Sequence, residues 1–439
     1  MKTRNIYSLL YVTFVAVMLV ACNDYDAAQT AYEEIVDSDV TTTPPNIDSA
    51  WELQLIPNVG QHSGEVFVYK DKKYDKLFTR TLGWNGGIGV QSTSLSDGNV
   101  LWAFNDSYFG VVDAETRARG NCNFPHNSIM VQTTVGETDD DLRWLVDYIQ
   151  TNDPDGEGYY QAYTHIAPDE TIMEETDEEH FYQIGGATIF DNNGVKELQM
   201  LWGEMDNHEG KMTRTGTCLA VYSLEGQPGN STYLKRISKN EEFNTDDVGY
   251  GSTIWKDEDG HIYLYVTENN RPLVARTTTH DLTSEWEYYI RDLSGNFMWQ
   301  KMYPTKEERT RSTIMENNYV CSMPQIFKKG DYYYMIGQAV SYGHSVYLYR
   351  GETPYGPFTD QKILFNGPYA VDKIGNQYYK NLLRVNLHLE LAREGELVFS
   401  TNTDADTAGD NFDFPGSADF CRPYFYRVFN WESIYDEDE

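Results

Sequence analysis

The chain has 439 residues, with 68 Asp or Glu against 34 Lys or Arg, and its formal net charge is −34 at pH 7. So acidic a chain would repel nucleic acid and anionic membranes, because both present phosphates, and it suits an exported protein with a neutral ligand. Aromatic residues make up 14% of the chain, with 34 Tyr, which is typical both of β-strands and of carbohydrate-facing surfaces.

The N-terminus predicts export. Lys2 and Arg4 precede an apolar run over residues 6–21, which is too short for a stable membrane span and predicts a signal peptide over residues 1–21. The run ends Leu-Val-Ala-Cys, which resembles a bacterial lipobox with Cys22 as the lipidated residue; the alternative is an ordinary signal peptide with a chance cysteine. The acidic stretch over residues 23–26 resembles the export signal of Bacteroidetes surface lipoproteins.

Residues 22–50 predict a lipidated cysteine and a flexible tether, because they are rich in Asp, Glu, Thr and Ala and lack apolar periodicity. Folding is expected to begin near Trp51, with residues 51–439 as a single domain. We therefore expect anchoring to the outer membrane through Cys22 as the only membrane contact, with the cell surface as the further expectation. Disulfide pairing and four buried thiols are both open for the remaining cysteines: Cys122, Cys218, Cys321 and Cys421.

A strand pattern recurs five times along the chain. A small or Gly-rich strand is followed by a turn, an aromatic-apolar strand that ends in polar residues, and a third strand. The copies begin near residues 86, 183, 250, 322 and 382. This pattern predicts an all-β five-bladed β-propeller, in which residues 51–77 supply an outer strand that closes the ring. The alternative is a β-sandwich or a two-domain β protein.

Antiparallel units bring polar residues of every blade to one mouth, because the second strand of each unit ends where the first begins. Asp106, Glu204 and Glu268 are the candidate catalytic carboxylates there, and Asp404 belongs to the same mouth. The alternative is that loops are simply polar. The candidate substrate-binding residues are Trp84, Asn85, His126, Asn127, Tyr250, Arg271, Gln338, His388, Asn402 and Arg422.

Carboxylates in an aromatic mouth are typical of glycosidic bond cleavage, in which one acid protonates the leaving oxygen and a second activates water. We assign Asp106 as the base and Glu204 or Glu268 as the acid, with Arg271 holding Glu268 ionised in a supporting role. Residues on facing blades favour a separation of about 6.5–9.5 Å and hence inversion. His126 would bind a sugar hydroxyl or help a metal, or serve as a structural residue.

No cofactor is expected, with one open possibility: His388 and Asn386 could hold a central ion or water, with calcium as the candidate ion. The wide cysteine spacing argues against a zinc site. No GxSxG, HExxH or phosphate-loop motif occurs.

The paired glycines are expected to allow close packing around the axis: Gly86, Gly87, Gly185 and Gly186.

Several segments resemble a bacterial five-bladed propeller family of unknown function. They include GWNGGIGVQSTSLSDGNVLWAFNDSYFG (residues 83–110), FPHNSIMVQ (124–132), DLTSEWEYY (281–289) and TPYGPF (353–358). That family is similar to endo-D-arabinanase propellers and, more distantly, to the arabinanases and xylosidases of glycoside hydrolase family 43. The resemblance implies a five-bladed propeller, a role in polysaccharide breakdown and an acidic role for Asp106.

The sequence departs from this family pattern at two acidic positions. Ile88 stands where the pattern carries an Asp, and Ile184-Gly185-Gly186 replaces a Gly-Asp-Gly segment. The first expectation is therefore a surface lipoprotein hydrolase that acts on an arabinan-type or related glycan. A glycan-binding lipoprotein with the same mouth and no turnover is the alternative, and a partner-binding propeller is the third.

Overall fold

The computed structural model describes most of the chain from residue 52 onward: residues 52–56, 66–133, 144–146, 164–168, 179–228, 230–244, 247–317, 319–338, 340, 343, 345–366, 373–374, 377–378, 382–405 and 407–438. The predicted signal peptide, Cys22 and the tether lie outside the described residues. Among the described helices, none has the length and apolar character needed to cross a bilayer.

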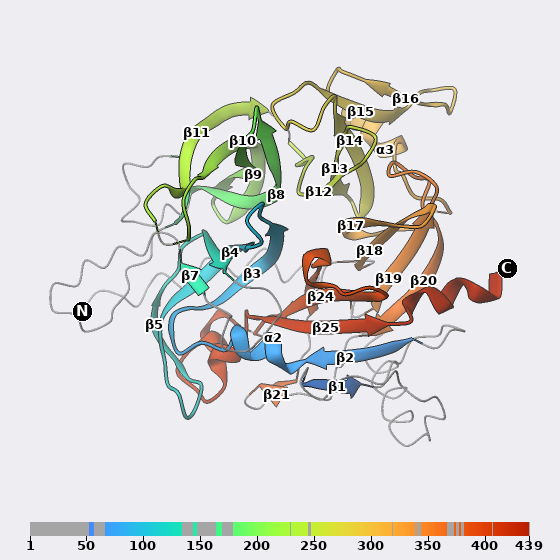
Figure 1. Cartoon of the computed structure of the whole chain (residues 1–439). Helices are drawn as coiled ribbons and strands as arrows, with labels where there is room; N and C mark the ends of the chain where they lie inside the picture. The colour runs from blue at the N-terminus through green and yellow to red at the C-terminus, as the bar shows by residue number, and fades with distance from the viewer. Residues whose placement is uncertain are drawn as a thin grey trace.

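Five antiparallel sheets surround one axis (Figure 1). Their innermost strands are β3 (Leu82–Ser94), β8 (His180–Asn192), β12 (Thr253–Lys256), β17 (Ser322–Lys329) and β23 (Leu382–Leu387). Each contacts the next in this order, and β23 contacts β3 again, so that the strands form a closed ring. The predicted five-bladed β-propeller is confirmed.

The remaining strands follow outward in each blade. Blade 1 adds β4 (Val100–Val112), β6 (Asn127–Gln132) and β7 (Trp144–Val146), with β5 (Arg119–Asn123) beside β4. Blade 2 adds β9 (Val195–His208), β10 (Lys211–Leu224) and β11 (Tyr233–Asn244). Blade 3 adds β13 (Ile262–Glu268), β14 (Arg271–Thr277), β15 (Trp286–Arg291) and β16 (Phe297–Gln300). Blade 4 adds β18 (Tyr332–Gln338), β19 (Ser345–Gly351) and β20 (Thr359–Asn366).

Blade 5 combines both ends of the folded chain. It contains β23, β24 (Glu396–Thr403), β25 (Pro423–Phe429), β2 (Phe67–Asp71) and β1 (Leu53–Ile56). The prediction that residues 51–77 close the ring is confirmed by the β2–β25 pairing, in which Val68 lies opposite Val428. Short elements lie between or after these strands: α2 (Lys72–Leu77), α3 (Lys306–Arg311), β21 (Lys373–Ile374), β22 (Gln377–Tyr378), η5 (Leu389–Leu391), η6 (Ala408–Asn411), η7 (Ser417–Asp419) and η8 (Trp431–Asp438).

Apolar side chains fill the spaces between neighbouring blades. Leu101 and Ile129 of blade 1 pack in one buried cluster with Leu198 and Trp202 of blade 2. A propeller strand has a neighbouring blade on each of its two faces. Its core sequence is therefore apolar at nearly every position, as in Leu-Trp-Ala-Phe before Asn105, and does not alternate with polar residues.

The four cysteines at 122, 218, 321 and 421 are free thiols.

Close backbone contacts at the axis explain the paired glycines. The N–H of Gly186 donates to the carbonyl of Gly251 in the next blade at 2.7 Å. A Cβ added at Gly186 would lie 2.5 Å from a methyl carbon of Ile254, closer than real Cβ contacts allow. Similarly, the N–H of Gly87 donates to the carbonyl of Cys421. The expected close packing of these glycines is confirmed.

Candidate functional site

The polar mouth begins at a break in the strand ladder of blade 1. β6 pairs with β4 only up to the pair Asn105–Asn127, and β5 pairs with the far end of β4. At the break, the N–H of Asp106 donates to the carbonyl of His126 at 2.9 Å. Asp106 thus lies inside β4, which continues to Val112, and not at the end of the strand as the sequence pattern predicted.

Asp106 is paired with His126 and open to solvent. Its Oδ1 lies 3.3 Å from Nδ1 of His126, and the two side chains are 29% and 12% exposed. The imidazole stacks on the ring of Phe181 from β8, with centroids 4.0 Å apart and planes at 13°. The N–H of His126 also donates to Oγ1 of Thr164 at 3.2 Å. The carboxylate is therefore held by a fixed imidazole on one side and is accessible on another.

A second carboxylate, Asp404, comes from the neighbouring blade 5. The Sγ of Cys421 donates to Oδ1 of Asp404 at 3.4 Å. Burial raises the pKa of the Cys421 thiol well above its ordinary value, and the negative charges of Asp404 and Asp106 raise it further. Asp404 therefore contacts this buried thiol directly, and Asp106 lies close enough to influence it electrostatically.

Aromatic rings line this side of the mouth. The ring of Tyr108 lies 4.8 Å from that of Phe124, which is 37% exposed, and 5.6 Å from that of Phe412. Beneath Tyr108, the guanidinium of Arg119 lies 4.1 Å from the ring centroid. The carboxylates of Asp106 and Asp404 thus adjoin an aromatic wall, the combination expected for a carbohydrate site.

Arg119 is a structural residue of the mouth that the sequence analysis did not identify. Its side chain is fully buried and donates to Oδ1 of Asn85 at 2.8 Å and to the carbonyls of Asn411 and Phe420 at 3.1 and 3.0 Å. Burial lowers the pKa of Arg119, and the neighbouring Tyr108 opposes that shift. Because its acceptors belong to two distant segments, Arg119 fixes blade 1 against the loop before β25.

Glu204 of blade 2 has the electrostatic character of a proton donor. Burial raises the pKa of its carboxyl, the charge of Glu241 raises it further, and His180 and Lys239 lower it. A Cβ at Gly216 would lie 3.3 Å from Oε2 of Glu204, so the carboxylate rests over this glycine. Glu204 lies within the long β9, as Asp106 lies within β4, and not at a strand end.

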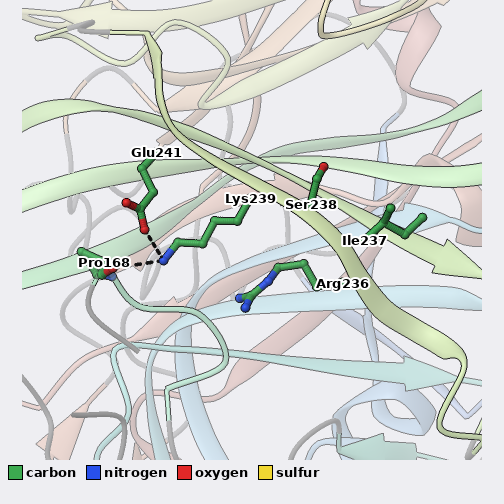
Figure 2. A pocket seen from close by; sticks show the side chains of 6 residues that line it. All are labelled: Pro168, Arg236, Ile237, Ser238, Lys239 and Glu241. Atoms are coloured by element: carbon green, nitrogen blue, oxygen red, sulfur yellow. Dashed lines mark hydrogen bonds and ion pairs between the residues drawn. The ribbon is translucent and has the colours of Figure 1, made fainter. Parts of the chain in front are cut away.

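An open hollow of about 510 Å³ lies on the outer strand of the same blade (Figure 2). Lys239 is its central charge: the ammonium donates to the carbonyls of Ala167 and Pro168 at 2.6 and 3.1 Å and pairs with Glu241 at 2.5 Å. Because Glu241 and Lys239 line the hollow and both shift the pKa of Glu204, the hollow adjoins that carboxyl.

Glu268 is held in a bidentate ion pair by a residue that the sequence analysis missed. Arg309 of α3 reaches its two carboxylate oxygens at 3.1 and 3.2 Å and also contacts Asp247 at 3.2 Å. The expected partner, Arg271, lies opposite Glu268 in the β13–β14 hairpin, but the short contacts come from Arg309. The capping box between Thr305 and Glu308 was the sequence signal for this helix.

Predicted substrate-binding residues of blade 1 are buried beneath the mouth. Trp84, Asn85 and Asn127 are fully buried. The ring of Trp84 packs 4.7 Å from that of Phe104, and Nδ2 of Asn127 donates to the carbonyl of Tyr182 at 2.9 Å. These three side chains stabilise the walls of the mouth and do not face its opening.

The other predicted binding residues are also engaged within the protein. Tyr250 packs 5.1 Å from Tyr288, and Gln338 donates to the carbonyl of Gly343. Nδ2 of Asn402 donates to the carbonyl of Gly87 at 2.8 Å, and Arg422 donates to Asp419 at 2.9 Å. The four side chains are at least nine-tenths buried: Tyr250, Gln338, Asn402 and Arg422.

An axial cavity of about 150 Å³ lies among the five inner strands, beside His388. Both nitrogens of His388 are hydrogen-bonded, to Oγ of Ser92 at 2.6 Å and to Oγ of Ser400 at 2.8 Å, and burial lowers its pKa to about 3. The cavity wall contains one carboxyl, that of Glu390, and the described residues include no group of three or more metal-ligating acids, His or Cys. Both ring nitrogens of His388 are therefore engaged by protein hydroxyls.

Arg384 is another mouth residue without a sequence signal. It lies in a bulge of β23, where the register shifts between Leu383 and Val385, and its φ is +58°. A Cβ at Gly89 would lie 2.9 Å from its Nη1 and 2.9 Å from Nδ2 of Asn105. The bulge thus brings the guanidinium from blade 5 to the neighbouring blade 1, close to Asn105 of the strand that bears Asp106.

The comparisons with known proteins identify the family. Residues 71–431 match the family model described as a domain of unknown function, DUF5005. The chain belongs to this family. A candidate hydrolase from Bacteroides ovatus ATCC 8483 has a crystal structure that is 54% identical, covers 92% of the chain and all of its own, and gives a TM-score of 0.83. No curated protein matches the chain.

This DUF5005 protein also has distant likenesses among solved structures. An exo-β-1,3-galactanase from Phanerochaete chrysosporium is 10% identical, with 78% of this chain and 60% of that one covered and a TM-score of 0.39. A xylan β-1,4-xylosidase from Bacillus halodurans is 12% identical, with 75% and 51% covered and a TM-score of 0.37. These scores are too low to bear on activity.

The two positions where the sequence lacks expected acids differ in the space around them. A Cβ at Gly185 would lie 2.8 Å from the carbonyl oxygen of Leu201, so blade 2 has no room for a side chain there. Ile88 is half-buried opposite Asn105 of β4. In blade 2, the position where the resemblance implies an acid therefore has no space for a side chain. In blade 1, an apolar side chain occupies the corresponding position.

Proposed function

We propose that this protein hydrolyses glycosidic bonds of a polysaccharide, of arabinan type or related, at the mouth formed by blades 1, 2 and 5. The observation that carries the proposal is the open carboxylate of Asp106, fixed by His126 and bordered by the Tyr108 wall. Carboxylates beside aromatic rings are the usual machinery for glycosides, because the rings pack against sugar faces while the acids act on the linkage.

In the proposed reaction, Asp106 acts as general base. Its carboxylate takes a proton from water as the water oxygen bonds to the anomeric carbon. The bond from this carbon to the glycosidic oxygen breaks, and that oxygen takes a proton from Glu204. Attack opposite to the leaving group inverts the anomeric configuration. The raised pKa of Glu204 supports the donor role, because it keeps the carboxyl protonated at a higher pH than an ordinary Glu.

Glu268 is given a supporting role. Its bidentate pairing with Arg309 occupies both carboxylate oxygens, which leaves it less suited to exchange a proton with substrate. Asp404 is the additional acid at the site of Asp106, and its charge would favour protonation of a neighbouring carboxyl or a positively charged sugar transition state.

The test is release of reducing ends from arabinans, galactans, xylans and host glycans by wild type, Asp106→Asn and Glu204→Gln. Asp331→Asn is the matched control, since Asp331 is an exposed turn residue between β17 and β18. We expect each mouth variant to lose about 10²–10⁴-fold in kcat/KM, while the control retains wild-type activity. Equal activity of Asp106→Asn and wild type would rule out the base role.

A non-catalytic glycan-binding role is the second candidate, favoured by one observation. Blade 2 has no room for the acid that the related pattern carries at Gly185. Under this alternative, no glycan of the panel is cleaved, one is bound, and Asp106→Asn weakens binding through a lost hydrogen bond to a sugar hydroxyl.

We further propose that the protein is exported and anchored to the outer membrane through a lipid on Cys22. Support comes from the basic start, the apolar run over residues 6–21 and the Leu-Val-Ala-Cys end of that run. Metabolic labelling with a fatty acid tests this directly. We expect label in wild type and none in Cys22→Ser; label in neither would contradict the anchor.

A further inference from the structure

The outer edge of blade 3 carries four clustered aromatic side chains, here called the aromatic platform: Tyr289 of β15, Phe297 and Trp299 of β16, and Tyr355 of the loop after β19. β15 and β16 are the outermost strands of their sheet and lie at the rim of the propeller (Figure 1). The inner strand of this blade, β12, lies three strands away at the axis. The platform is therefore separate from the mouth.

The strand register brings three of these rings to one face. Trp299 lies opposite Tyr289, and Phe297 lies opposite Arg291, so that Tyr289, Phe297 and Trp299 point to the same side of the β15–β16 hairpin, together with Arg291. The rings of Tyr289 and Phe297 are stacked, with centroids 4.9 Å apart and planes at 15°. The ring of Trp299 lies 4.7 Å from that of Tyr289.

Two sequence segments without a role in the mouth meet on the platform. Tyr289 ends the segment DLTSEWEYY, and Tyr355 belongs to TPYGPF. The ring of Tyr355 lies 5.0 Å from Tyr289 and 5.5 Å from Trp299. Tyr263 is fully buried beneath them, 6.1 Å from Tyr355. The platform thus rests on the core with one side and faces solvent with the other, where Phe297 is 39% exposed.

The polar groups of the platform are not used within the described part of the protein. The hydroxyls of Tyr289 and Tyr355 and the indole N–H of Trp299 make no hydrogen bond to any described residue. Nearby tyrosines differ: Tyr263 donates to Asp259 at 2.5 Å, and Tyr333 donates to Asp257 at 2.8 Å. Tyr and Trp that serve packing normally satisfy their polar groups, so these three are available to a ligand.

Charged groups border the rings. The guanidinium of Arg276 lies 4.2 Å from the centroid of Trp299 and is fixed by two contacts to Glu287, at 2.7 and 2.9 Å. Arg291 lies over the ring of Phe297, 5.6 Å from its centroid. Fixed donors and acceptors thus stand beside flat apolar surfaces.

We propose that the aromatic platform is a second carbohydrate-binding site, which holds a polysaccharide chain at the rim of the propeller. The apolar C–H groups of sugar rings would pack against the exposed parts of Tyr289, Phe297 and Trp299. The sugar hydroxyls would bond to the free phenol and indole groups and to the Arg276–Glu287 pair. The net charge of −34 opposes a nucleic acid ligand, which is the other class that stacks on aromatic rings. This site stands whether or not the mouth hydrolyses its glycan.

The test uses the mature full-length chain and affinity electrophoresis through gels that contain arabinan, galactan or xylan, together with a pull-down on insoluble polysaccharide. The platform variants are Trp299→Ala and Tyr289→Ala. The milder Trp299→Phe and Tyr289→Phe variants keep a ring, so their folding is secure. The matched control is Tyr332→Ala, because Tyr332 is a 38% exposed tyrosine of blade 4 that also carries an arginine, Arg350, over its ring.

We expect the two alanine variants to lower retention at least about tenfold, equivalent to about 1.4 kcal/mol, since each removes an aromatic ring of the platform. The phenylalanine variants should lower it less, and Tyr332→Ala should migrate as wild type. Asp106→Asn should keep platform-dependent retention even where hydrolysis is lost. This result separates failure of the mouth from failure of the platform.

Two results would overturn the proposal. The first is wild-type retention by both alanine variants whose thermal unfolding matches wild type. The second is absence of retention on every glycan together with concentration-dependent self-association that Trp299→Ala abolishes. The neighbouring side chains Leu293, Met298 and Met302 are 92%, 49% and 78% exposed, so that this second result would mark the rim as an interface between protein copies.

Discussion

Oδ1 of Asp106 lies 3.3 Å from Nδ1 of His126, where Asp106 belongs to β4 and His126 to the segment between β5 and β6, at the point where the ladder of blade 1 opens. The opening exists because β5 and β6 pair with different halves of β4 and leave residues 124–126 outside both strands. The pair is therefore a consequence of strand architecture, and the stacking of His126 on Phe181 ties it to blade 2.

Replacing His126 tests whether this pair serves catalysis. His126→Ala leaves Asp106 in place and removes the group that orients its carboxylate. We expect a fall of about tenfold to 10²-fold in kcat/KM, the usual cost of a misplaced catalytic group, with a smaller change in thermal stability. The measurement is initial rate on the best glycan of the panel. The control is His208→Ala, an exposed histidine at the end of β9.

Positions 88 and 185 should respond differently to an introduced acid. Ile88→Asp replaces a half-buried side chain beside Asn105 and should still yield a folded protein with a modest loss of stability. Gly185→Asp places a Cβ 2.8 Å from the carbonyl of Leu201 at the axis and should cost several kcal/mol, about 1–3 kcal/mol from overpacking alone plus the burial of a charge. Urea unfolding of the two variants compares them; equal stability would contradict the steric argument.

The sequence predicts the ring because each blade repeats the same strand pattern, and the last blade lacks an outer strand that residues 51–77 could supply. It predicts the mouth less well. Asp106 and Asp404 both influence the thiol of Cys421, but the side chains of Trp84, Asn85 and His388 are buried. The sequence pattern is the same whether a polar residue beside an apolar strand points outward or inward. Arg309 lies in an inserted helix and Arg384 in a β-bulge. The repeated strand pattern predicts the position of neither side chain.

The stability of the closed ring should depend on pH through Asp75. Burial raises the pKa of its carboxyl to about 7, while Arg422 and Lys70 oppose the shift, and Oδ1 accepts the N–H of Phe425 at 2.9 Å. The unfolded chain has an ordinary Asp pKa of about 3.9. The folded state therefore binds this proton more tightly, and its stabilisation is full below pH 4 and is lost as pH rises through 7, at about 1.4 kcal/mol per pKa unit.

Asp75→Asn removes this titration and keeps an acceptor for Phe425. The unfolding free energy of the variant should therefore rise relative to wild type between pH 4 and pH 8, as measured by urea unfolding at several pH values. Asp113→Asn is a control of opposite sign. Hydrogen bonds from Thr116 lower the pKa of Asp113, so that its contribution is lost as pH falls. A pH-independent difference between Asp75→Asn and wild type would contradict the assignment.

The ion pairs of Arg427 should be essential to the closure of blade 5. This side chain is 1% exposed and bonds to Asp71 at 2.6 Å and to Glu396, so it joins β2, β25 and β24. Arg427→Met would leave the buried carboxylate of Asp71 without its cation and Glu396 with Arg393 alone, and a broken buried pair costs about 3–5 kcal/mol. The matched control is Arg350→Met. Its partner Asp360 is 44% exposed, and the loss should be about 0–1 kcal/mol.

Urea unfolding followed by tryptophan fluorescence measures both losses. If the β2–β25 pairing closes the ring, the Arg427→Met transition should also broaden, because the N-terminal strands would detach from blade 5 before the remaining blades unfold. A loss no larger than that of Arg350→Met would show that apolar contacts such as Val68 against Val428 suffice for closure. In that case Arg427 would only neutralise Asp71 and Glu396, and the triple variant Asp71→Asn, Glu396→Gln, Arg427→Met should fold as stably as wild type.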